Sequence, residues 1–201
     1  MVDSVYTSSN LQKHTSANPL QRMLLARFHT RAAALLTRVT PMPRRILDAG
    51  CGEGFAMRAV LGASGAELVG LDGSPAALHL ADRLNPGRRF AAGDLYALPF
   101  SERSFDLVVC MEVLEHLHDP GRGLRELCRV SGGWLLLSVP NEPLFRGANF
   151  LRGKNLHAWG NDPGHVNHWS AHAFLRFVGA QCRVEAACTS FPWTLALCRA
   201  A

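Results

Sequence analysis

The sequence predicts an α/β fold in which a mostly parallel sheet of seven strands is covered by helices on both faces. Short apolar segments alternate with helical segments along most of the chain, which is the pattern of a parallel sheet with crossover helices. The chain has 201 residues, enough for one domain with a sizeable core, and hydrophobic residues make up 48% of it. No internal repeat or low-complexity tract interrupts this alternation.

The N-terminal part is expected to form a helical cap before the sheet begins. Apolar residues recur at helical spacing over residues 20–38, and the arginines of this segment lie mostly on the other face. Pro41 and Pro43 end this helix, because proline cannot continue the helical hydrogen-bond ladder. We therefore divide the chain into a helical cap segment, residues 1–40, and an α/β domain, residues 41–201.

Seven segments of this domain are expected to be strands, because each is a short, largely apolar run between turn-forming residues. They span residues 45–48, 66–72, 89–91, 105–110, 133–139, 183–189 and 193–199. The segments between them predict helices at residues 55–61, 75–84, 124–130 and 170–178. The second of these helices has a favourable start, with Ser74 as its N-cap and Pro75 in its first turn.

The predicted topology indicates where a ligand would bind. Right-handed crossovers place the carboxyl ends of parallel strands along one edge of the sheet. Ligands of such sheets bind at that edge, at the point where the strand order reverses. Residues that directly follow the predicted strands are therefore the first candidates for a binding site.

Composition and charge argue against several classes of protein. The formal net charge is +5, but the basic residues are isolated apart from Arg44–Arg45 and Arg88–Arg89, so a nucleic-acid partner is not favoured. The six cysteines show none of the short spacings of zinc ribbons and redox motifs, and most lie among apolar residues, as small core residues would. No apolar run is long enough to span a membrane and the N-terminal residues are polar, which indicates a cytoplasmic protein without a signal peptide.

The first predicted strand leads into a glycine-rich turn, Asp48-Ala49-Gly50-Cys51-Gly52-Glu53-Gly54. Its glycines allow a tight turn and a close approach of the backbone to a ligand. The dinucleotide fingerprint would need a glycine at position 55, where the chain has Phe55, so a pyrophosphate cradle is not favoured. Asp48 would repel a phosphate but attract an ammonium group. Taken alone, such a turn is as often a purely structural connection.

Acidic residues also follow the second and third predicted strands. Asp72 ends the second strand, where a carboxylate can accept both hydroxyl groups of a ribose. Asp94 follows Gly93 after the third strand and could accept a hydrogen bond from an adenine amino group. Either residue alone could be a helix cap or a turn residue. Together with Asp48 they match an amine, a ribose and an adenine of one ligand.

These motifs resemble those of class I S-adenosylmethionine-dependent methyltransferases, and in particular of their type 11 group. The stretch from Asp48 to Gly54 looks like the glycine-rich motif of that family, and Asp72 looks like its ribose-binding acid. Three further stretches are similar to its adenine-contacting loop, its fourth strand and the turn after that strand, in this order: residues 93–100, 104–108 and 112–117. The resemblance covers residues 40–140 well and extends more loosely to the end of the chain.

The resemblance implies a Rossmann-like fold, S-adenosylmethionine as the cofactor, and methyltransferase activity in the domain. The implied cofactor site comprises Asp48, Gly50, Cys51, Gly52, Asp72, Gly73, Asp94, Leu95, Met111 and His116. The backbone of Met111 would lie near the amine of the cofactor, and His116 would lie near the adenine or the acceptor. The structural alternative for His116 is a helical pair with Glu112 or Glu115.

A long aromatic and histidine-rich connection, residues 140–170, is expected to form a lid that faces the acceptor. A loop of this length inside a compact domain is usually functional or disordered, and its aromatic content argues against disorder. Because it follows the fifth strand, it should lie at the same edge of the sheet as the cofactor. Residues 164–170 resemble a segment that precedes the last helix in many type 11 methyltransferases.

Three histidines are the candidate catalytic residues, because imidazole titrates near neutral pH: His116, His165 and His168. Glu112 is a weaker candidate base. The alternative for His165 and His168 is that they anchor the loop through hydrogen bonds. Four histidines are spaced so that some could share a metal ion: His157, His165, His168 and His172. No cysteine or acidic pattern completes it, so no metal is expected.

The expected reaction is direct transfer of a methyl group from the sulfonium to an O or N atom of a small-molecule or modified-peptide acceptor, with C or S less favoured. The protein must mainly align donor and acceptor in a dry site, and it needs a base only if the acceptor loses a proton. Three alternatives stay open: a non-catalytic domain that binds the cofactor, an RNA methyltransferase, and a nicotinamide-dependent oxidoreductase. The glycine spacing disfavours the last of these, and the scattered basic residues disfavour RNA.

Overall fold

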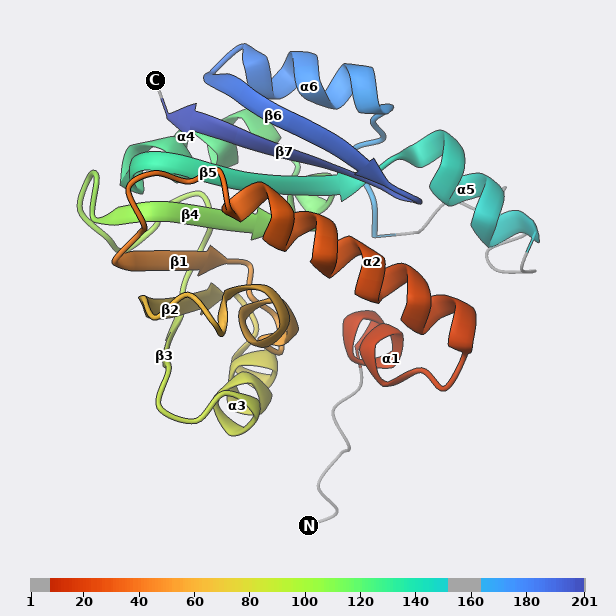
Figure 1. Cartoon of the computed structure of the whole chain (residues 1–201), viewed down its shortest axis with the longest axis horizontal. Coiled ribbons are helices and arrows are strands. Elements are labelled where there is room, and N and C mark those ends of the chain that lie inside the picture. The colour runs from red at the N-terminus through yellow and green to blue at the C-terminus, as the bar shows by residue number, and fades with distance from the viewer. Residues whose placement is uncertain (1–7, 152–163, 201) are drawn as a thin grey trace.

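The strands form one sheet in the order β3-β2-β1-β4-β5-β7-β6 in the computed structural model, which describes residues 8–151 and 164–200 (Figure 1). Their bounds are β1 Arg45–Ala49, β2 Glu67–Asp72, β3 Arg89–Ala92, β4 Phe105–Met111, β5 Ser131–Pro140, β6 Cys182–Ser190 and β7 Trp193–Ala200. Strands β1 to β5 run parallel to one another, whereas β7 runs antiparallel to both β5 and β6. The predicted mostly parallel, Rossmann-like sheet of seven strands is therefore confirmed.

The helical elements alternate with the strands as the sequence predicts. They are α1 Ser9–Thr15, α2 Pro19–Leu36, the π-helical turn η1 Met57–Leu61, α3 Pro75–Leu84, the 3-10 turn η2 Leu114–His116, α4 Pro120–Val130, α5 Glu142–Leu151 and α6 Ala171–Gly179. Several begin at a polar side chain that accepts a backbone N–H of the first turn; these caps are Asn18, Ser74, Asp119 and Ser170. Among the described residues, none of the helices combines the length and apolar character that a bilayer span needs.

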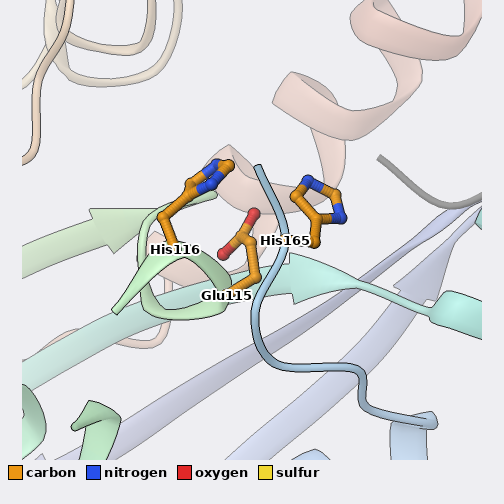
Figure 2. Close-up of side chains that lie close together, drawn as sticks. All are labelled: Glu115, His116 and His165. Atoms are coloured by element: carbon orange, nitrogen blue, oxygen red, sulfur yellow. The ribbon is translucent and has the colours of Figure 1, made fainter. Parts of the chain in front are cut away.

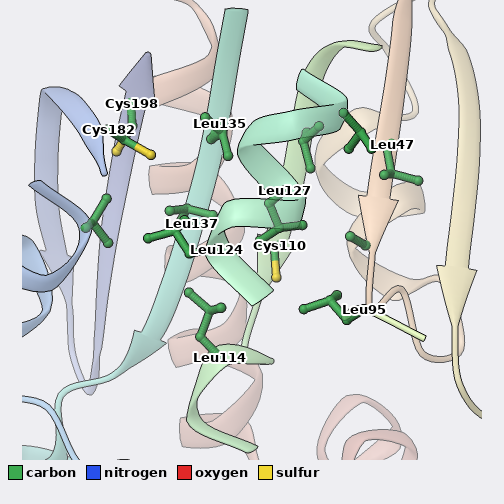
Figure 3. Packing of buried hydrophobic residues seen from close by; sticks show 14 of the residues in the cluster. Leu47, Leu95, Cys110, Leu114, Leu124, Leu127, Leu135, Leu137, Cys182 and Cys198 are labelled. Carbon is green, nitrogen blue, oxygen red and sulfur yellow. The ribbon is translucent and has the colours of Figure 1, made fainter. Parts of the chain in front are cut away.

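Helices cover both faces of the sheet, because successive residues of each central strand point to opposite faces. On β4, Val108 and Cys110 pack with α4 and α6, while Leu107 and Val109 pack on the other face with α2 and η1. Figure 3 shows the first of these layers, in which leucines from α4 meet leucines of β1 and β5. Each layer is fully buried at its centre, which fixes the register of the strands.

The strand order places the candidate site at one edge of this sheet. From β1 the chain builds outward to β2 and β3, and then returns to add β4 on the other side of β1. Adjacent strand ends diverge at such a reversal, so the ends of β1 and β4 border a crevice. Figure 1 shows α1 and part of α2 lying near these ends, and α5 projecting beyond the end of β5.

Two helices were missed in the sequence. Helix α1 is short and polar, so it has no apolar period to detect, and it is fixed by Ser8, whose hydroxyl accepts the N–H of Leu11 at 2.8 Å. Helix α5 lies within the connection that was expected to be a loop from residue 140 to 170. Its first turn closes on Asn141, whose carbonyl accepts the N–H of Phe145 at 2.8 Å.

Candidate active site

The turn after β1 begins in a backbone conformation that favours glycine. Gly50 has a φ of +76°, and a Cβ at this position would lie 2.4 Å from Cγ2 of Val113. Its N–H donates to the carbonyl of Leu71 at 2.7 Å, which fixes the turn against the end of β2. Any side chain at Gly50 would therefore meet both backbone strain and the Val113 side chain.

Asp48 supplies a buried carboxylate at the end of β1. It is 2% exposed and lines the cavity at this edge of the sheet, and its Oδ2 has no hydrogen-bond partner among the described residues. Burial, together with the nearby Asp72, raises the pKa of Asp48 to about 7. A buried carboxylate atom without a partner is costly in the free protein and favours a cationic ligand.

Asp72 links the glycine-rich turn to the beginning of α3. Its Oδ2 accepts the N–H of Gly52 at 2.8 Å, and its Oδ1 accepts the N–H of Ser74 at 2.8 Å. The carboxylate is thereby held at the lip of the cavity. Each oxygen still has a second lone pair, so the pair can accept two further hydrogen bonds from a vicinal diol.

The third expected strand-end acid is arranged differently. Asp94 is exposed, and its Oδ1 accepts the N–H of Tyr96 at 2.9 Å, which forms a local turn. Leu95 is buried in the core beneath it. Gly73, Asp94 and Leu95 lie beyond the residues that line the cavity, whereas Asp48, Gly50, Cys51, Gly52 and Asp72 line it.

The cavity itself has a volume of about 630 Å³ and lies between the strand ends and the N-terminal helices. Its walls come from α1, α2, the glycine-rich turn, the turn after β4, and the start of β7. Apolar and aromatic side chains also line the cavity: Leu20, Leu24, Phe28, Phe145 and Trp193. Such a volume is in the range of sites that hold a small organic ligand.

Helix α1 is tied to the glycine-rich turn through Glu53. This carboxylate is 1% exposed and accepts hydrogen bonds from the Ser8 hydroxyl and the Asn10 side-chain amide. The next turn of α1 carries His14, whose ring stacks on Phe55 with centroids 4.2 Å apart. Burial, followed by the charge of Lys13, lowers the pKa of His14 to about 3, so this ring acts as a neutral aromatic surface.

The turn after β4 brings acidic side chains into the cavity. Met111 is 8% exposed, and Glu112 follows it with a φ of +61°, which turns the chain sharply into η2. The Glu112 Oε1 accepts a hydrogen bond from the Ser138 hydroxyl at 3.0 Å. Burial raises the pKa of Glu112, and burial and then the Glu112 charge raise the pKa of the fully buried Glu115 well above its usual range.

Residues 164–170 return to this turn along an irregular path. The N–H groups of Val166 and Asn167 both donate to the carbonyl of Glu115, at 2.9 and 3.0 Å. The Asn167 side chain donates to the carbonyl of Leu117 at 2.5 Å. The part of the expected lid that the structure describes is therefore anchored by backbone contacts beside η2. Residues 152–163, which include His157, lie outside the described residues.

The three candidate catalytic histidines differ in position. His165 Nδ1 lies 2.7 Å from Glu142 Oε1, both side chains are almost buried, and His165 lines the cavity. His168 Nδ1 lies 3.5 Å from the same oxygen, but its side chain is 42% exposed and does not line the cavity. His116 Nδ1 lies 2.7 Å from the carbonyl oxygen of Gly164 and also lines the cavity. His165 thus both contacts Glu142 and lines the cavity, whereas its catalytic role stays a prediction.

Figure 2 shows the Glu115 carboxyl group between the rings of His116 and His165. Each of the three offers one potential metal-ligand atom, and these atoms lie within 4.8 Å of one another. The centroids of the two imidazoles are 5.0 Å apart. This set differs from the four histidines weighed in the sequence and shares only His165 with them. It could hold a divalent cation only if the Glu115 carboxyl group were ionised.

Sequence reasoning missed four residues of the site: Lys13, His14, Glu53 and Glu142. Lys13 and His14 were missed because α1 was not predicted. Glu53 was missed because it was interpreted only as part of the glycine-rich turn. Lys13 is the only lysine or arginine among the described residues that line the cavity, and its Nζ lies 5.7 Å from the Trp193 ring centroid. A signal for Glu142 did exist, since it directly follows the fifth strand.

A mostly parallel sheet with acidic residues at two neighbouring strand ends, next to a cavity of this size, is the arrangement of an α/β protein with a small-ligand site at the edge of its sheet. A sequence profile described as a methyltransferase domain matches residues 21–181. That range includes the glycine-rich turn, both strand-end acids and the return segment. The chain therefore belongs to the methyltransferase-domain family, and its sheet has the Rossmann-like class I fold.

Curated relatives agree with this family but match only part of the chain. A demethylmenaquinone methyltransferase of Renibacterium salmoninarum is 36% identical over 104 residues, which are 51% of this chain and 44% of the relative. A ubiquinone biosynthesis O-methyltransferase of Bordetella avium is 35% identical over 106 residues, 49% of this chain and 43% of the relative. The chain thus matches less than half of the length of these relatives.

Solved structures show that the fold is shared over nearly the whole chain. The magnesium protoporphyrin IX methyltransferase of Synechocystis, solved with bound SAH, superposes with a TM-score of 0.72 at 19% identity and covers 95% of this chain and 92% of its own. A putative methyltransferase of Haloferax volcanii, solved in complex with the Trm112 activator, has a TM-score of 0.69 at 22% identity over 90% and 92% of the two chains. Because these sequence identities are 19% and 22%, the likeness to the two solved structures shows a shared fold and nothing further.

Proposed function

We propose that this protein binds S-adenosylmethionine at the Asp48–Asp72 end of the cavity and transfers its methyl group to an O or N atom of a small organic acceptor. The observation that carries the proposal is the unpartnered Oδ2 of Asp48, a buried acidic atom at the edge of a cavity. It fits the ammonium group of the cofactor. Asp72, held by two backbone N–H groups, fits the ribose diol.

The rest of the cavity is the proposed acceptor site. Phe28, Phe145 and Trp193 give it apolar walls suited to a flat ring, and His165 and Glu112 supply polar groups beside them. One relative is named a demethylmenaquinone methyltransferase and another a ubiquinone biosynthesis O-methyltransferase, and the second name supports an oxygen acceptor. We therefore favour a hydroxyl group on an aromatic ring over an amine, and a small molecule over a modified peptide.

The sulfonium supplies an already activated methyl group, so the residues of this chain mainly align the acceptor and handle its proton. With Nδ1 facing Glu142, His165 presents Nε2 as the nitrogen that can accept a proton from the acceptor hydroxyl. The Glu142 carboxyl group orients the ring and stabilises the imidazolium. His116, which lines the cavity, and His168, which does not, are proposed to position the segment around the acceptor.

The description of residues 140–170 as a lid is part of the same proposal. Its described portion borders the cavity through Phe145 and His165, and its return to η2 is fixed at the Glu115 carbonyl. The N-terminal helices close the opposite side through Lys13 and Phe28. Together these elements would exclude water from the reacting atoms, which a methyl transfer requires for efficiency.

The direct test is methyl transfer from S-adenosylmethionine carrying a labelled methyl group to a panel of acceptors. Matched phenols, catechols and anilines of one size would be compared, with a short unmodified RNA and a peptide as further acceptors. We expect label in the phenols or catechols and much less in the anilines. Cofactor binding by calorimetry without transfer to any acceptor would instead support a non-catalytic binding domain. Transfer to RNA alone would overturn the small-molecule assignment.

A further inference from the structure

Two cysteines far apart in the sequence meet on the side of the sheet away from the cavity. Cys128 lies near the end of α4 and Cys182 is the first residue of β6, and their Sγ atoms are 3.0 Å apart. All six cysteines are free thiols. Among the described residues, the hydrogen-bond contact between two sulfur atoms is the one between Cys128 and Cys182. The spacing of cysteines in the sequence gave no sign of it, because 54 positions separate the two residues.

We propose that Cys128 and Cys182 form a modification site, at which a hydroperoxide oxidises the two thiols to an intramolecular disulfide. The two sulfurs are already 3.0 Å apart, so an approach of about 1 Å brings them to the bond length of about 2.05 Å. This proposal does not depend on the proposed acceptor.

The two thiols have different environments. Cys128 is partly exposed, so a small oxidant reaches it, whereas Cys182 is 5% exposed. The hydrogen bond from the Cys182 thiol lowers the pKa of Cys128, and the same contact, together with burial, raises the pKa of Cys182. Cys128 is therefore the thiol that reacts first, and Cys182 is the one that resolves the product.

The chemistry balances with one equivalent of peroxide. The Cys128 thiolate attacks a peroxide oxygen, an S–O bond forms as the O–O bond breaks, and hydroxide or an alkoxide leaves and takes a proton from water. The Cys182 sulfur then attacks the sulfenic sulfur of Cys128, an S–S bond forms as the S–O bond breaks, and the leaving hydroxide takes the Cys182 proton as water. The two thiols lose two electrons in total and the peroxide gains them.

Cys198 is the competing thiol, since it lies on the neighbouring strand β7 close to Cys182 (Figure 3). It is 0% exposed, and burial raises its pKa to about 12, so it is a poor first nucleophile. No sulfur–sulfur contact links it to Cys182 among the described residues. The Cys128–Cys182 pair is therefore the expected product.

The bond would join two segments that flank the candidate active site. The chain runs from His116 through η2 into α4 and Cys128, and from His165 through α6 into β6 and Cys182. A disulfide between them closes a covalent loop around β5, α5 and α6, which stabilises the native state by restricting the unfolded chain.

The test uses the full chain, treated at low micromolar concentration with hydrogen peroxide and then with a thiol reductant. We expect intact mass to fall by about 2 Da, the two hydrogens removed, and to return on reduction. Trypsin should release the peptide Glu126–Arg129 linked to the peptide Phe177–Arg183, each of which holds one cysteine of the pair. The unfolding temperature should rise by about 5–10 °C in the oxidised protein.

Cys128→Ser and Cys182→Ser should each abolish the mass loss, whereas Cys188→Ser, which changes a thiol at another site, should retain it. The peptide map of the unchanged protein keeps the test independent of how the variants fold. A gain of about 16 or 32 Da at Cys128 without a cross-link would overturn the proposal. So would a cross-link from the Cys182 peptide to the Val184–Arg199 peptide, or a disulfide-linked dimer.

Discussion

The carboxylate of Asp72 accepts the backbone N–H of Gly52 at 2.8 Å, so the end of β2 fixes the turn that follows β1. Its other oxygen accepts the N–H of Ser74 and fixes the start of α3. One side chain thus sets the position of two segments that border the cavity, and it is also the proposed acceptor of the ribose hydroxyl groups. Its loss should therefore affect both the turn and the ligand.

We expect Asp72→Ala to weaken S-adenosylmethionine binding by about 1–3 kcal/mol, because two ribose hydroxyls lose a charged acceptor. Asp82→Ala is the matched control, since Asp82 is an exposed acid of the adjacent helix α3. Titration calorimetry would compare both variants with the unchanged protein. Equal affinity in a folded Asp72→Ala protein would remove this residue from the cofactor site.

Cofactor affinity should fall as the pH falls through about 7. The buried Asp48 has an ordinary pKa of 3.8 raised to about 7 in the free protein, so it is half protonated near neutrality. An ammonium group binds the ionised form, so below pH 7 a proton must leave on binding and the affinity falls by up to about tenfold per pH unit. Calorimetry in buffers of different ionisation enthalpy would detect this proton release near pH 6. A pH-independent affinity in Asp48→Asn is the expected control result.

The raised pKa of Asp48 should also make the free energy of unfolding depend on pH. A carboxyl group whose folded pKa is raised stabilises the protein below its unfolded pKa and loses that contribution as the pH rises from about 4 to about 7. Relative to the unchanged protein, ligand-free Asp48→Asn should therefore gain stability between pH 4 and pH 8. Denaturant unfolding at both pH values measures the difference. A constant difference between the two proteins would contradict the raised pKa.

Gly50→Val should nearly abolish cofactor binding while the sheet still forms. The backbone at Gly50 has a φ of +76°, and a Cβ would lie 2.4 Å from a methyl group of Val113. Gly65→Val is the matched control, because Gly65 has a φ of +69° but nothing within 4 Å of the added Cβ. Both variants carry backbone strain, and only the first disturbs the site. Similar binding losses in the two would mean that strain alone is responsible.

His165→Ala should lower turnover by about 10²–10⁴-fold if His165 is the base, with cofactor affinity almost unchanged. The pH profile of turnover should then lose the limb that the base contributes. His168→Ala should have a smaller effect with an unaltered profile, because this side chain is 42% exposed and outside the cavity. His172→Ala, an exposed histidine of α6, is the control. Single-turnover rates measured across pH, once an acceptor is known, distinguish a base from a residue that only positions the acceptor. Full activity in His165→Ala would exclude His165 from the acceptor site.

Methyl transfer should survive treatment with a chelator. Burial and then the Glu112 charge raise the pKa of Glu115 well above its usual range, and a protonated carboxyl group is a poor metal ligand. Activity would be measured after dialysis against EDTA and after return of Mg²⁺, Mn²⁺ or Zn²⁺. A loss that a divalent ion restores, and that Glu115→Gln reproduces, would show that Glu115, His116 and His165 hold a cation.

The sequence predicted the sheet well because its signals are local. Each strand is a short apolar run and several helices begin at a capping residue, so the elements from Arg45 to Val139 could be placed within a few residues. The glycine-rich turn and Asp72 were also visible, since their position at strand ends follows from the topology. These features need only residues that are close in the chain.

The part of the cavity proposed to hold the acceptor was harder to predict from the sequence, because it is formed by contacts between residues far apart in the chain. Helix α1 is defined by its contact with Glu53, and nothing in its own residues forms an apolar face. The importance of Glu142 comes from its contact with His165, 23 positions further on. His165 and His168 look alike in the sequence, and only the packing shows that one is buried and the other exposed.

The attachment of α1 to Glu53 also bears on protein engineering. A chain shortened to begin near α2 would lose two donors to a side chain that is 1% exposed, together with the ring that covers Phe55. Such a truncation removes contacts to Glu53 and Phe55, in and beside the glycine-rich turn, although it deletes no residue of the motif itself. In directed evolution of acceptor preference, residues of α1 such as Lys13 and His14 therefore belong in the same library as those of the motifs.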